Sequence, residues 1–334
     1  MEKKLLILVL LLIVYNVSGT NKTKLGIIGL DTSHSVAFIK AINDNEKNEK
    51  AYADFRVVAA YPYGSKIIES SSKRIPEYIE TAEKSGVEIV NSIEDLLKRV
   101  DYVLLETNDG TLHLEQAIEV FKSGKPVFID KPIAATLADG IAIFKLAEKY
   151  NVPLFSASSL RYNPAVAAIN SGEYGKVLSA DCYSPAHREA THSEFFWYGV
   201  HGAEMLFAVM GTGCLTVCCI SSEDQDLAVG VWNDDRIGSF RGLTKGSAGY
   251  GGTAFCEKKI VPAAKHEGYE GLLKEILKFF TTKVPPVPAQ ETLEIFTFME
   301  AASKSKKNGG KTVKLADVYK EAEKKADKII GNKK

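Results

Sequence analysis

The chain has 334 residues, of which 25% are charged and 45% hydrophobic, an ordinary composition for a globular protein. Its length is more typical of two domains than of one. The 42 basic residues balance the 42 acidic ones, so the formal net charge is zero and does not favour nucleic acid or anionic membranes as partners.

The first nineteen residues resemble a secretory signal peptide. Lysines at positions 3 and 4 precede an apolar run of about eleven residues, Leu5 to Tyr15, and the small residues Ser18 and Gly19 follow. A membrane-spanning helix needs about 20 apolar residues, so an uncleaved tether is the weaker alternative. We predict a signal peptide over residues 1–19, export to the periplasm, and no membrane span in the mature protein.

The first part of the mature chain alternates between apolar strands and amphipathic helices. The predicted strands are Lys24–Leu30, Arg56–Tyr61, Glu88–Asn91, Tyr102–Glu106, Pro126–Asp130 and Val152–Ser156. The predicted helices are Val36–Asn43, Ser72–Ser85, Ile93–Arg99, His113–Lys122 and Leu137–Tyr150. This alternation indicates an α/β fold with a doubly wound parallel sheet, that is, a Rossmann dinucleotide-binding domain over residues 24–157.

The pattern changes after about residue 158. Longer strands are predicted at Gly175–Tyr183, Gly213–Ser221, Asp226–Trp232 and Arg236–Leu243. Helices are predicted at Glu194–Met210, Tyr269–Thr281 and Glu291–Lys306, and another at the C-terminus. Residues 158–334 are therefore expected to form an α+β domain with an open, mostly antiparallel sheet that binds the substrate.

The turn after the first strand occupies the place where a dinucleotide fold binds phosphates. Gly29 matches the first glycine of the G-x-G-x-x-G pattern, but Asp31 replaces the second and His34 the third. A carboxylate at Asp31 adds bulk and negative charge where a pyrophosphate would approach. Thr32 and Ser33 still offer hydroxyl groups, and His34 offers a ring nitrogen.

The second strand ends without the acid that usually binds the adenosine ribose. Ser65 and Lys66 follow it instead, and these residues would tolerate a 2′-phosphate better than an acid would. The expected cofactor is NAD or NADP, with a slight preference for NADP.

Four later segments occur in an informative order: Glu106-Thr-Asn-Asp-Gly-Thr-Leu-His113, Gly124-Lys-Pro-Val-Phe-Ile-Asp-Lys-Pro132, Arg161-Tyr-Asn-Pro164 and Gly199-Val-His201. Through them the chain resembles the Gfo/Idh/MocA oxidoreductases from about Lys24 to Leu315. The Asp-Lys-Pro element is similar to that family's Glu-Lys-Pro signature. The resemblance implies that Lys131 lies beside the nicotinamide and the substrate and that His201 is the catalytic histidine.

Further roles follow from the same resemblance. His113, Thr107 and Asn108 are expected to contact the cofactor, and Arg161 and Asn163 the substrate. The alternative is that His113, at the start of a helix, and His201, within an apolar helix, are purely structural.

The chain also departs from the family. Trp197 stands where an acid usually precedes the catalytic histidine by four residues, and Tyr198 follows it. Both aromatic rings suit stacking on a sugar. Glu204, one turn after His201, is the candidate to replace the acid that orients the catalytic histidine. His187 and Arg188 lie in a polar loop and are candidate substrate ligands.

Two functions remain open. The first is an NAD(P)-dependent oxidoreductase of a carbohydrate or cyclitol, with redox-assisted glycoside cleavage as a variant. The second is a cofactor-free periplasmic carbohydrate-binding protein with a degenerate Rossmann domain. Family members often pair through the open sheet, so a homo-oligomer is expected by analogy. The five cysteines show no metal-binding spacing, and no metal is predicted.

Overall fold

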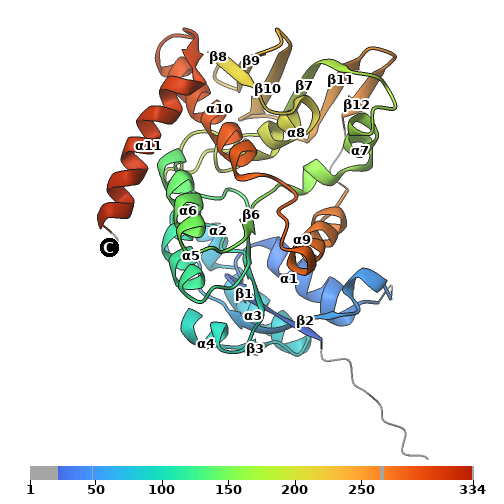
Figure 1. Ribbon diagram of the computed structural model, residues 1–334, viewed down its shortest axis with the longest axis vertical. Coiled ribbons are helices and arrows are strands. Elements are labelled where there is room, and N and C mark those ends of the chain that lie inside the picture. The colour runs from blue at the N-terminus through green and yellow to red at the C-terminus, as the bar shows by residue number, and fades with distance from the viewer. Residues whose placement is uncertain (1–21, 47, 264–266, 333–334) are drawn as a thin grey trace, which may run out of the picture.

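The computed structural model describes residues 22–46, 48–263 and 267–332. Two sheets organise these residues, as the arrows in Figure 1 show. The first sheet has six parallel strands in the order β3-β2-β1-β4-β5-β6. Their bounds are β1 Thr23–Ile28, β2 Phe55–Tyr61, β3 Glu88–Ile89, β4 Tyr102–Leu105, β5 Val127–Ile129 and β6 Leu154–Phe155. This order is that of a classic dinucleotide-binding domain, so the predicted fold class is confirmed.

Helices connect these strands, as periodicity predicted. They are α1 Ser33–Ile39, α2 Glu69–Ser72, α3 Ile75–Lys84, α4 Ile93–Leu97, α5 His113–Lys122 and α6 Leu137–Lys149. Two short helices, η1 Lys40–Asp44 and η2 Lys50–Tyr52, follow α1. The hydroxyl of Ser92 caps α4 by accepting a hydrogen bond from Asp95 N, and Thr136 caps α6 in the same way. The central strands are buried because helices cover both faces of a parallel sheet.

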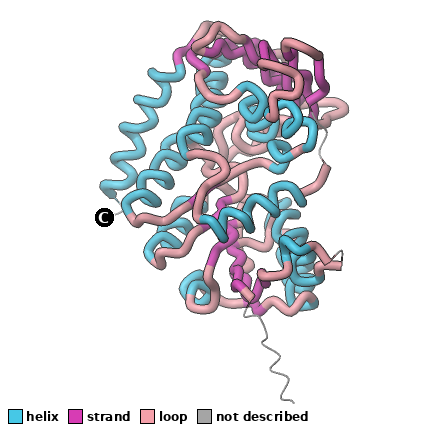
Figure 2. The backbone as a smooth tube through the Cα atoms, turned by 45° about the vertical axis from the view of Figure 1, so that its right-hand side comes forward, coloured by secondary structure: helices cyan, strands magenta, loops and turns pink. Residues whose placement is uncertain are grey.

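The second sheet has seven strands in the order β12-β11-β7-β10-β9-β8-β13. All neighbouring pairs are antiparallel except β7 with β10. The strands are β7 Val177–Pro185, β8 Cys214–Ser221, β9 Gln225–Trp232, β10 Ile237–Leu243, β11 Gly251–Cys256, β12 Ile260–Ala263 and β13 Val313–Lys314. The open, mostly antiparallel sheet is thus confirmed, and Figure 2 shows it at the end of the molecule opposite the first sheet.

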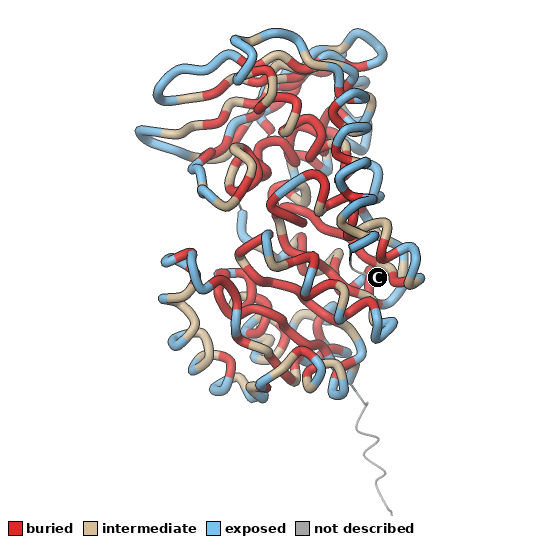
Figure 3. Tube along the Cα trace, turned by 90° about the vertical axis from the view of Figure 1, so that its left-hand side faces the viewer, coloured by how far each residue is buried: buried red, intermediate tan, exposed pale blue. Residues whose placement is uncertain are grey.

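The helices of the second half are η3 Ser159–Tyr162, α7 Pro164–Asn170, α8 Val200–Met210, α9 Glu270–Thr282, α10 Ala289–Lys307 and α11 Leu315–Asn332. Helices α8 and α10 cover one face of the second sheet, with α7 against strand β12 and α11 against strand β8. Every residue of α8 is buried, between the sheet and α10. Figure 3 shows this interior in red, with exposed blue segments along the outer strands and loops.

One helix of the second half packs on the first sheet. The Phe280 ring of α9 stacks on Tyr102 of β4 with ring centroids 4.9 Å apart, and Phe279 meets Phe155 of β6 edge to face at 5.0 Å. Figure 1 shows α9 beside α1 accordingly. The chain therefore returns from the second sheet to cover the Rossmann layer, which brings residues near 269 to the first turn.

One local prediction was wrong in detail. The helix predicted from Glu194 begins only at Val200, because Phe195 and Phe196 are buried within loop turns, Phe196 against Phe296 at 4.6 Å. The five cysteines are unpaired, and four of them are buried. The predicted signal peptide lies outside the described residues. No helix among those described is long and apolar enough to cross a membrane.

Candidate functional site

Four polar side chains gather at the carboxyl ends of the parallel strands. Glu106 follows β4, Asp130 and Lys131 follow β5, and His34 comes from the first turn of α1. His34 Nδ1 lies 3.0 Å from Asp130 Oδ1 and 3.9 Å from Glu106 Oε2. We call His34, Glu106 and Asp130 the carboxylate cluster. Ligands bind open α/β sheets at this edge, which makes the cluster the centre of the candidate site.

Burial sets the charge of the cluster. It raises the pKa of Glu106 well above its ordinary value, and the neighbouring charge of Asp130 adds to the rise. Burial also works against the charged form of Asp130, but His34 and Lys131 outweigh it and lower the pKa of Asp130 to about 2. Glu106 therefore tends to stay protonated and Asp130 to stay ionised, as in sites where one carboxyl acts as an acid and the other as a base.

Lys131 follows β5 at the carboxyl edge of the parallel sheet. Its side chain is 14% exposed, and its Nζ is 3.9 Å from Asp130 Oδ2. That distance is too long for a hydrogen bond, so Asp130 attracts the ammonium group without a direct bond. Lys131 is thus a positive charge at the sheet edge with an accessible face.

Asp31, in the first turn, has hydrogen-bond partners within the protein. Its side chain is buried: Oδ1 accepts a hydrogen bond from Asn108 N at 3.0 Å, and Oδ2 accepts one from Ser65 N at 3.3 Å. The carboxylate also contacts the position where a Cβ on Gly64 would lie. Asp31 therefore joins the loops after β1, β2 and β4.

Burial also leaves Asp31 easy to protonate. It raises the pKa of Asp31 to about 6; the N–H groups of Asn108 and Ser65 act against the rise, and the charge of Asp109 adds to it. Asp31 is charged at neutral pH and neutral in mild acid.

Gly29 behaves as the motif requires. Its φ is +92°, and a Cβ there would lie 2.5 Å from Thr107 N. Only glycine allows this turn to approach the β4 loop so closely. Thr32 caps α1 by accepting from Ser35 N, and the Ser33 hydroxyl lies 3.1 Å from the Tyr269 hydroxyl. Both hydroxyls expected at the cofactor already have partners.

Three further residues of the predicted cofactor site make contacts within the protein. His113 is fully buried, with Nε2 2.6 Å from Thr107 O and Nδ1 3.2 Å from Ile133 O, so it joins the β4 and β5 loops. The Asn108 amide donates to Ser71 Oγ at 2.8 Å. Ser65 Oγ donates to Asp109 at 2.7 Å, which leaves exposed Lys66 as the remaining candidate for a 2′-phosphate.

His201 faces this edge from the second half. Its Nδ1 lies 2.8 Å from Ser158 Oγ, and its ring meets Tyr250 edge to face at 5.5 Å. Burial raises the pKa of Tyr250 to about 12, and the charges of Tyr198 and Tyr269 contribute. Tyr269 in turn packs on His34 at 4.3 Å. Tyr250 therefore lies beside His201, and Tyr269 beside the carboxylate cluster.

Arg161 and Glu204 form an ion pair. Arg161 Nε donates to Glu204 at 2.8 Å, and Arg161 Nη2 lies 2.6 Å from Glu291. Glu204 is buried and the Arg161 side chain is 12% exposed, so the charge of Arg161 is already balanced by two carboxylates. Ser158, not Glu204, is the residue hydrogen-bonded to His201 Nδ1. Asn163 caps α7 by accepting from Ala165 N.

The loop before α8 lies between the two halves. His192 Nε2 accepts a hydrogen bond from Gly110 N at 3.0 Å, and the Trp197 ring packs on His192 at 4.8 Å. Burial lowers the pKa of His192 to about 4, which keeps it neutral. His187 packs on Tyr198 at 5.5 Å, whereas Arg188 pairs with Asp226 at 3.0 Å.

Sequence reasoning missed five residues here: Glu106, Asp130, Ser158, Tyr250 and Tyr269. Glu106 and Asp130 each follow an apolar strand directly, and that position is the signal that could have identified them. No local signal marks the two tyrosines, because the return of α9 and the second sheet bring them to this edge.

Some residues at the carboxyl edge of the parallel sheet suit a bound dinucleotide, and one does not. Thr107 Oγ1 is buried without a hydrogen-bond partner, as an acceptor for a ribose hydroxyl would be, and Gly29 gives the required tight turn. Asp31 is the exception, because its charge repels phosphate.

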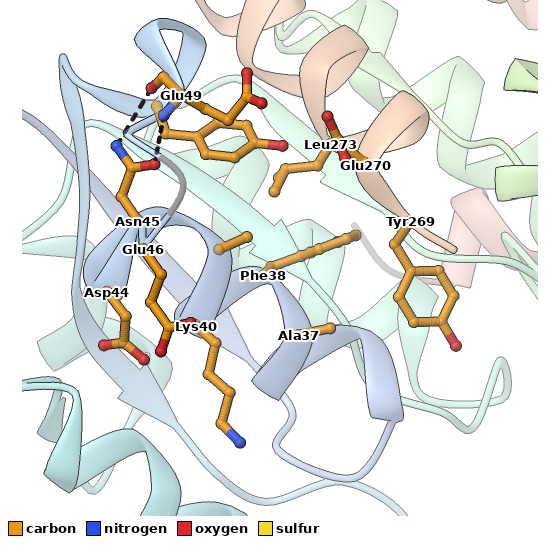
Figure 4. A pocket seen from close by; sticks show the side chains of 12 residues that line it. Ala37, Phe38, Lys40, Asp44, Asn45, Glu46, Glu49, Tyr269, Glu270 and Leu273 are labelled. Carbon is orange, nitrogen blue, oxygen red and sulfur yellow. Dashed lines mark hydrogen bonds between the residues drawn. The ribbon is translucent and has the colours of Figure 1, made fainter. Parts of the chain in front are cut away.

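A pocket of about 350 Å³ lies between α1 and α9, and Phe38 is one of the residues that line it (Figure 4). Tyr269 lies at one end of it and Glu49, hydrogen-bonded to Asn45, at the other.

Comparison with known proteins supports the first half most directly. Residues 23–158 match the model of an oxidoreductase family with an NAD-binding Rossmann fold. The inositol 2-dehydrogenase of Serratia proteamaculans is 29% identical over 119 residues, which is 34% of each chain. The uncharacterized oxidoreductase YhhX of Escherichia coli K12 is 22% identical over 140 residues, or 38% of this chain and 41% of YhhX. The chain thus matches well under half the length of these relatives.

Solved structures extend the likeness to both halves. The scyllo-inositol dehydrogenase of Lactobacillus casei, solved with NAD(H) and scyllo-inositol, superposes with a TM-score of 0.70 at 14% identity. The match covers 88% of this chain and 99% of that one. At this identity the comparison shows a common fold.

Proposed function

Residues 23–158 match the Gfo/Idh/MocA oxidoreductase family, and from that match we propose that the protein carries out an NAD(P)-dependent oxidation or reduction of a cyclitol or another carbohydrate. The observation that carries the proposal is the position of Lys131 at the carboxyl edge of the parallel sheet, with His201 facing that edge. Inositol dehydrogenases among the similar proteins support the substrate class.

The chemistry divides between two side chains. Lys131 polarises the reacting hydroxyl and stabilises negative charge on its oxygen. His201, held by Ser158 at Nδ1, takes or returns the hydroxyl proton. The Tyr250 ring packs on His201 edge to face, and burial keeps its hydroxyl protonated up to high pH. When bound, the nicotinamide supplies the hydride chemistry, and Gly29, Thr107 and Asn108 line its site.

The test is native mass spectrometry on protein isolated from its source cells, followed by turnover assays with inositols and aldoses. We expect bound NAD(H) or NADP(H), reduction of added NAD(P)+ by one of these substrates, and a mass lower by residues 1–19. A protein that arrives empty and binds no dinucleotide at millimolar concentration would favour the alternative, a cofactor-free carbohydrate-binding protein. The buried charge of Asp31 is the observation that favours that alternative.

We also propose self-association through the open face of the second sheet. Tyr183, Ile220, Val231 and Ile237 are exposed there, on the face that α8 and α10 leave uncovered. A symmetric dimer would bury them. Ile237→Glu is expected to convert an oligomer into a monomer in analytical ultracentrifugation. Ile67→Glu, at an exposed position outside this sheet, is the control that should leave the mass unchanged.

A further inference from the structure

The carboxylate cluster has the composition of a metal site. We propose that His34, Glu106 and Asp130 together bind one divalent transition-metal ion of the zinc or manganese class. This site lies at the same sheet edge as the proposed oxidoreductase site, but it does not depend on that activity, and its occupancy can be measured without any turnover.

The distances suit a shared ion. The ligand atoms of the three residues lie within 4.8 Å of one another, with His34 Nδ1 3.0 Å from Asp130 and 3.9 Å from Glu106. Zinc binds nitrogen and oxygen ligands at about 2.0–2.2 Å, which separates adjacent ligand atoms by about 3–4 Å. The side chains need only small adjustments to receive the ion.

Unpartnered oxygens point independently to a missing cation. Both oxygens of Glu106 and the Oδ2 of Asp130 are buried without a hydrogen-bond partner, and both residues are 0% exposed. Burying carboxylates in this way costs several kcal/mol unless a charge or donor compensates them. Lys131, whose Nζ is 3.9 Å from Asp130 Oδ2, is beyond hydrogen-bond reach. An ion among the three ligands would satisfy these oxygens.

The donor set selects the class of metal. One imidazole with two carboxylates suits zinc, manganese or iron(II), whereas magnesium and calcium prefer oxygen ligands alone. Three protein ligands leave a coordination position for water or for a ligand oxygen. The ligands follow three different strands, so spacing along the sequence could not reveal the set.

The experiment uses the full chain stripped of metal with a chelator. Cobalt(II) reports ligand number through its visible absorption, and zinc affinity follows from calorimetry or from displacement of cobalt. We expect one ion per chain and a higher melting temperature with metal. Glu106→Gln should weaken binding by roughly 100-fold, because it removes one of three ligands. This variant should fold, since the Glu106 oxygens accept no hydrogen bond.

The matched control is Glu294→Gln. Glu294 accepts hydrogen bonds from Gly213 N and Cys214 N, far along the chain from the cluster. It should bind cobalt and zinc like the wild type. The proposal is wrong if the stripped wild type takes up no stoichiometric metal, or if Glu106→Gln binds as tightly as the wild type. The second result would assign the ion to another site and the cluster to a metal-free pair of His34 and Asp130.

Discussion

Replacement of Lys131 by alanine is expected to lower kcat by about 100- to 1,000-fold, the usual effect of losing one group that stabilises developing negative charge. Lys131 follows β5 and is partly exposed at the carboxyl edge of the sheet. Its Nζ lies 3.9 Å from Asp130 Oδ2. Its ammonium group would act mainly in the transition state, so kcat should fall more than the affinity for substrate. Steady-state kinetics at saturating cofactor measure both quantities.

Lys122→Ala is the control for this prediction. Lys122 is exposed in the last turn of α5, away from the sheet edge, and its loss should leave kcat unchanged. Thermal melting should show both variants folded. A Lys131→Ala enzyme that keeps its full kcat would refute the assigned role, whatever the substrate.

The affinity for NAD+ is expected to rise at least about tenfold between pH 8 and pH 5. Burial raises the pKa of Asp31 to about 6, so its carboxylate is charged at the upper pH and largely neutral at the lower. Unit charges about 4 Å apart interact by several kcal/mol at a protein surface, and 1.4 kcal/mol already corresponds to tenfold. Removing one negative charge beside the pyrophosphate should therefore tighten binding.

Two acids and one base lie near this carboxyl. Asp109 adds negative charge, Glu106 favours its protonated form, and Arg74 Nη1 donates a hydrogen bond to the Asp31 carbonyl oxygen at 3.5 Å. NAD+ is the required probe, because the 2′-phosphate of NADP+ itself titrates near pH 6.

Two variants separate Asp31 from the other titrating groups. Asp31→Asn should bind NAD+ almost equally at pH 5 and pH 8, as measured by calorimetry. Asp31→Gly should bind more tightly than the wild type at pH 8, although it loses the hydrogen bonds from Asn108 and Ser65. A pH dependence that persists in Asp31→Asn would show that another group controls phosphate binding.

Most strands and helices of residues 24–157, and their order, could be predicted from the sequence. The helix at His113–Lys122 was predicted with the bounds that the structure has, because its apolar residues recur at helical spacing. The strand ending at Asp130 followed from an unbroken apolar run, and the Ser92 cap from its position before such a helix. These are local properties, and a chain of alternating strands and helices has few ways to form a sheet. The position of Lys131 at the carboxyl edge follows from that order.

Only the tertiary structure decided which side chains meet. Asp31 was expected near a phosphate, and the structure adds that its carboxylate accepts hydrogen bonds from Ser65 and Asn108, 34 and 77 positions away. Arg161 was expected to contact the substrate, and in the structure its guanidinium donates a hydrogen bond to Glu204, 43 positions later in the chain. The carboxylate cluster and the contact of Tyr269 with His34 depend equally on the path of the chain. Periodicity reports which face of an element is buried, whereas the partner of a buried charge is set by the elements that fold against it.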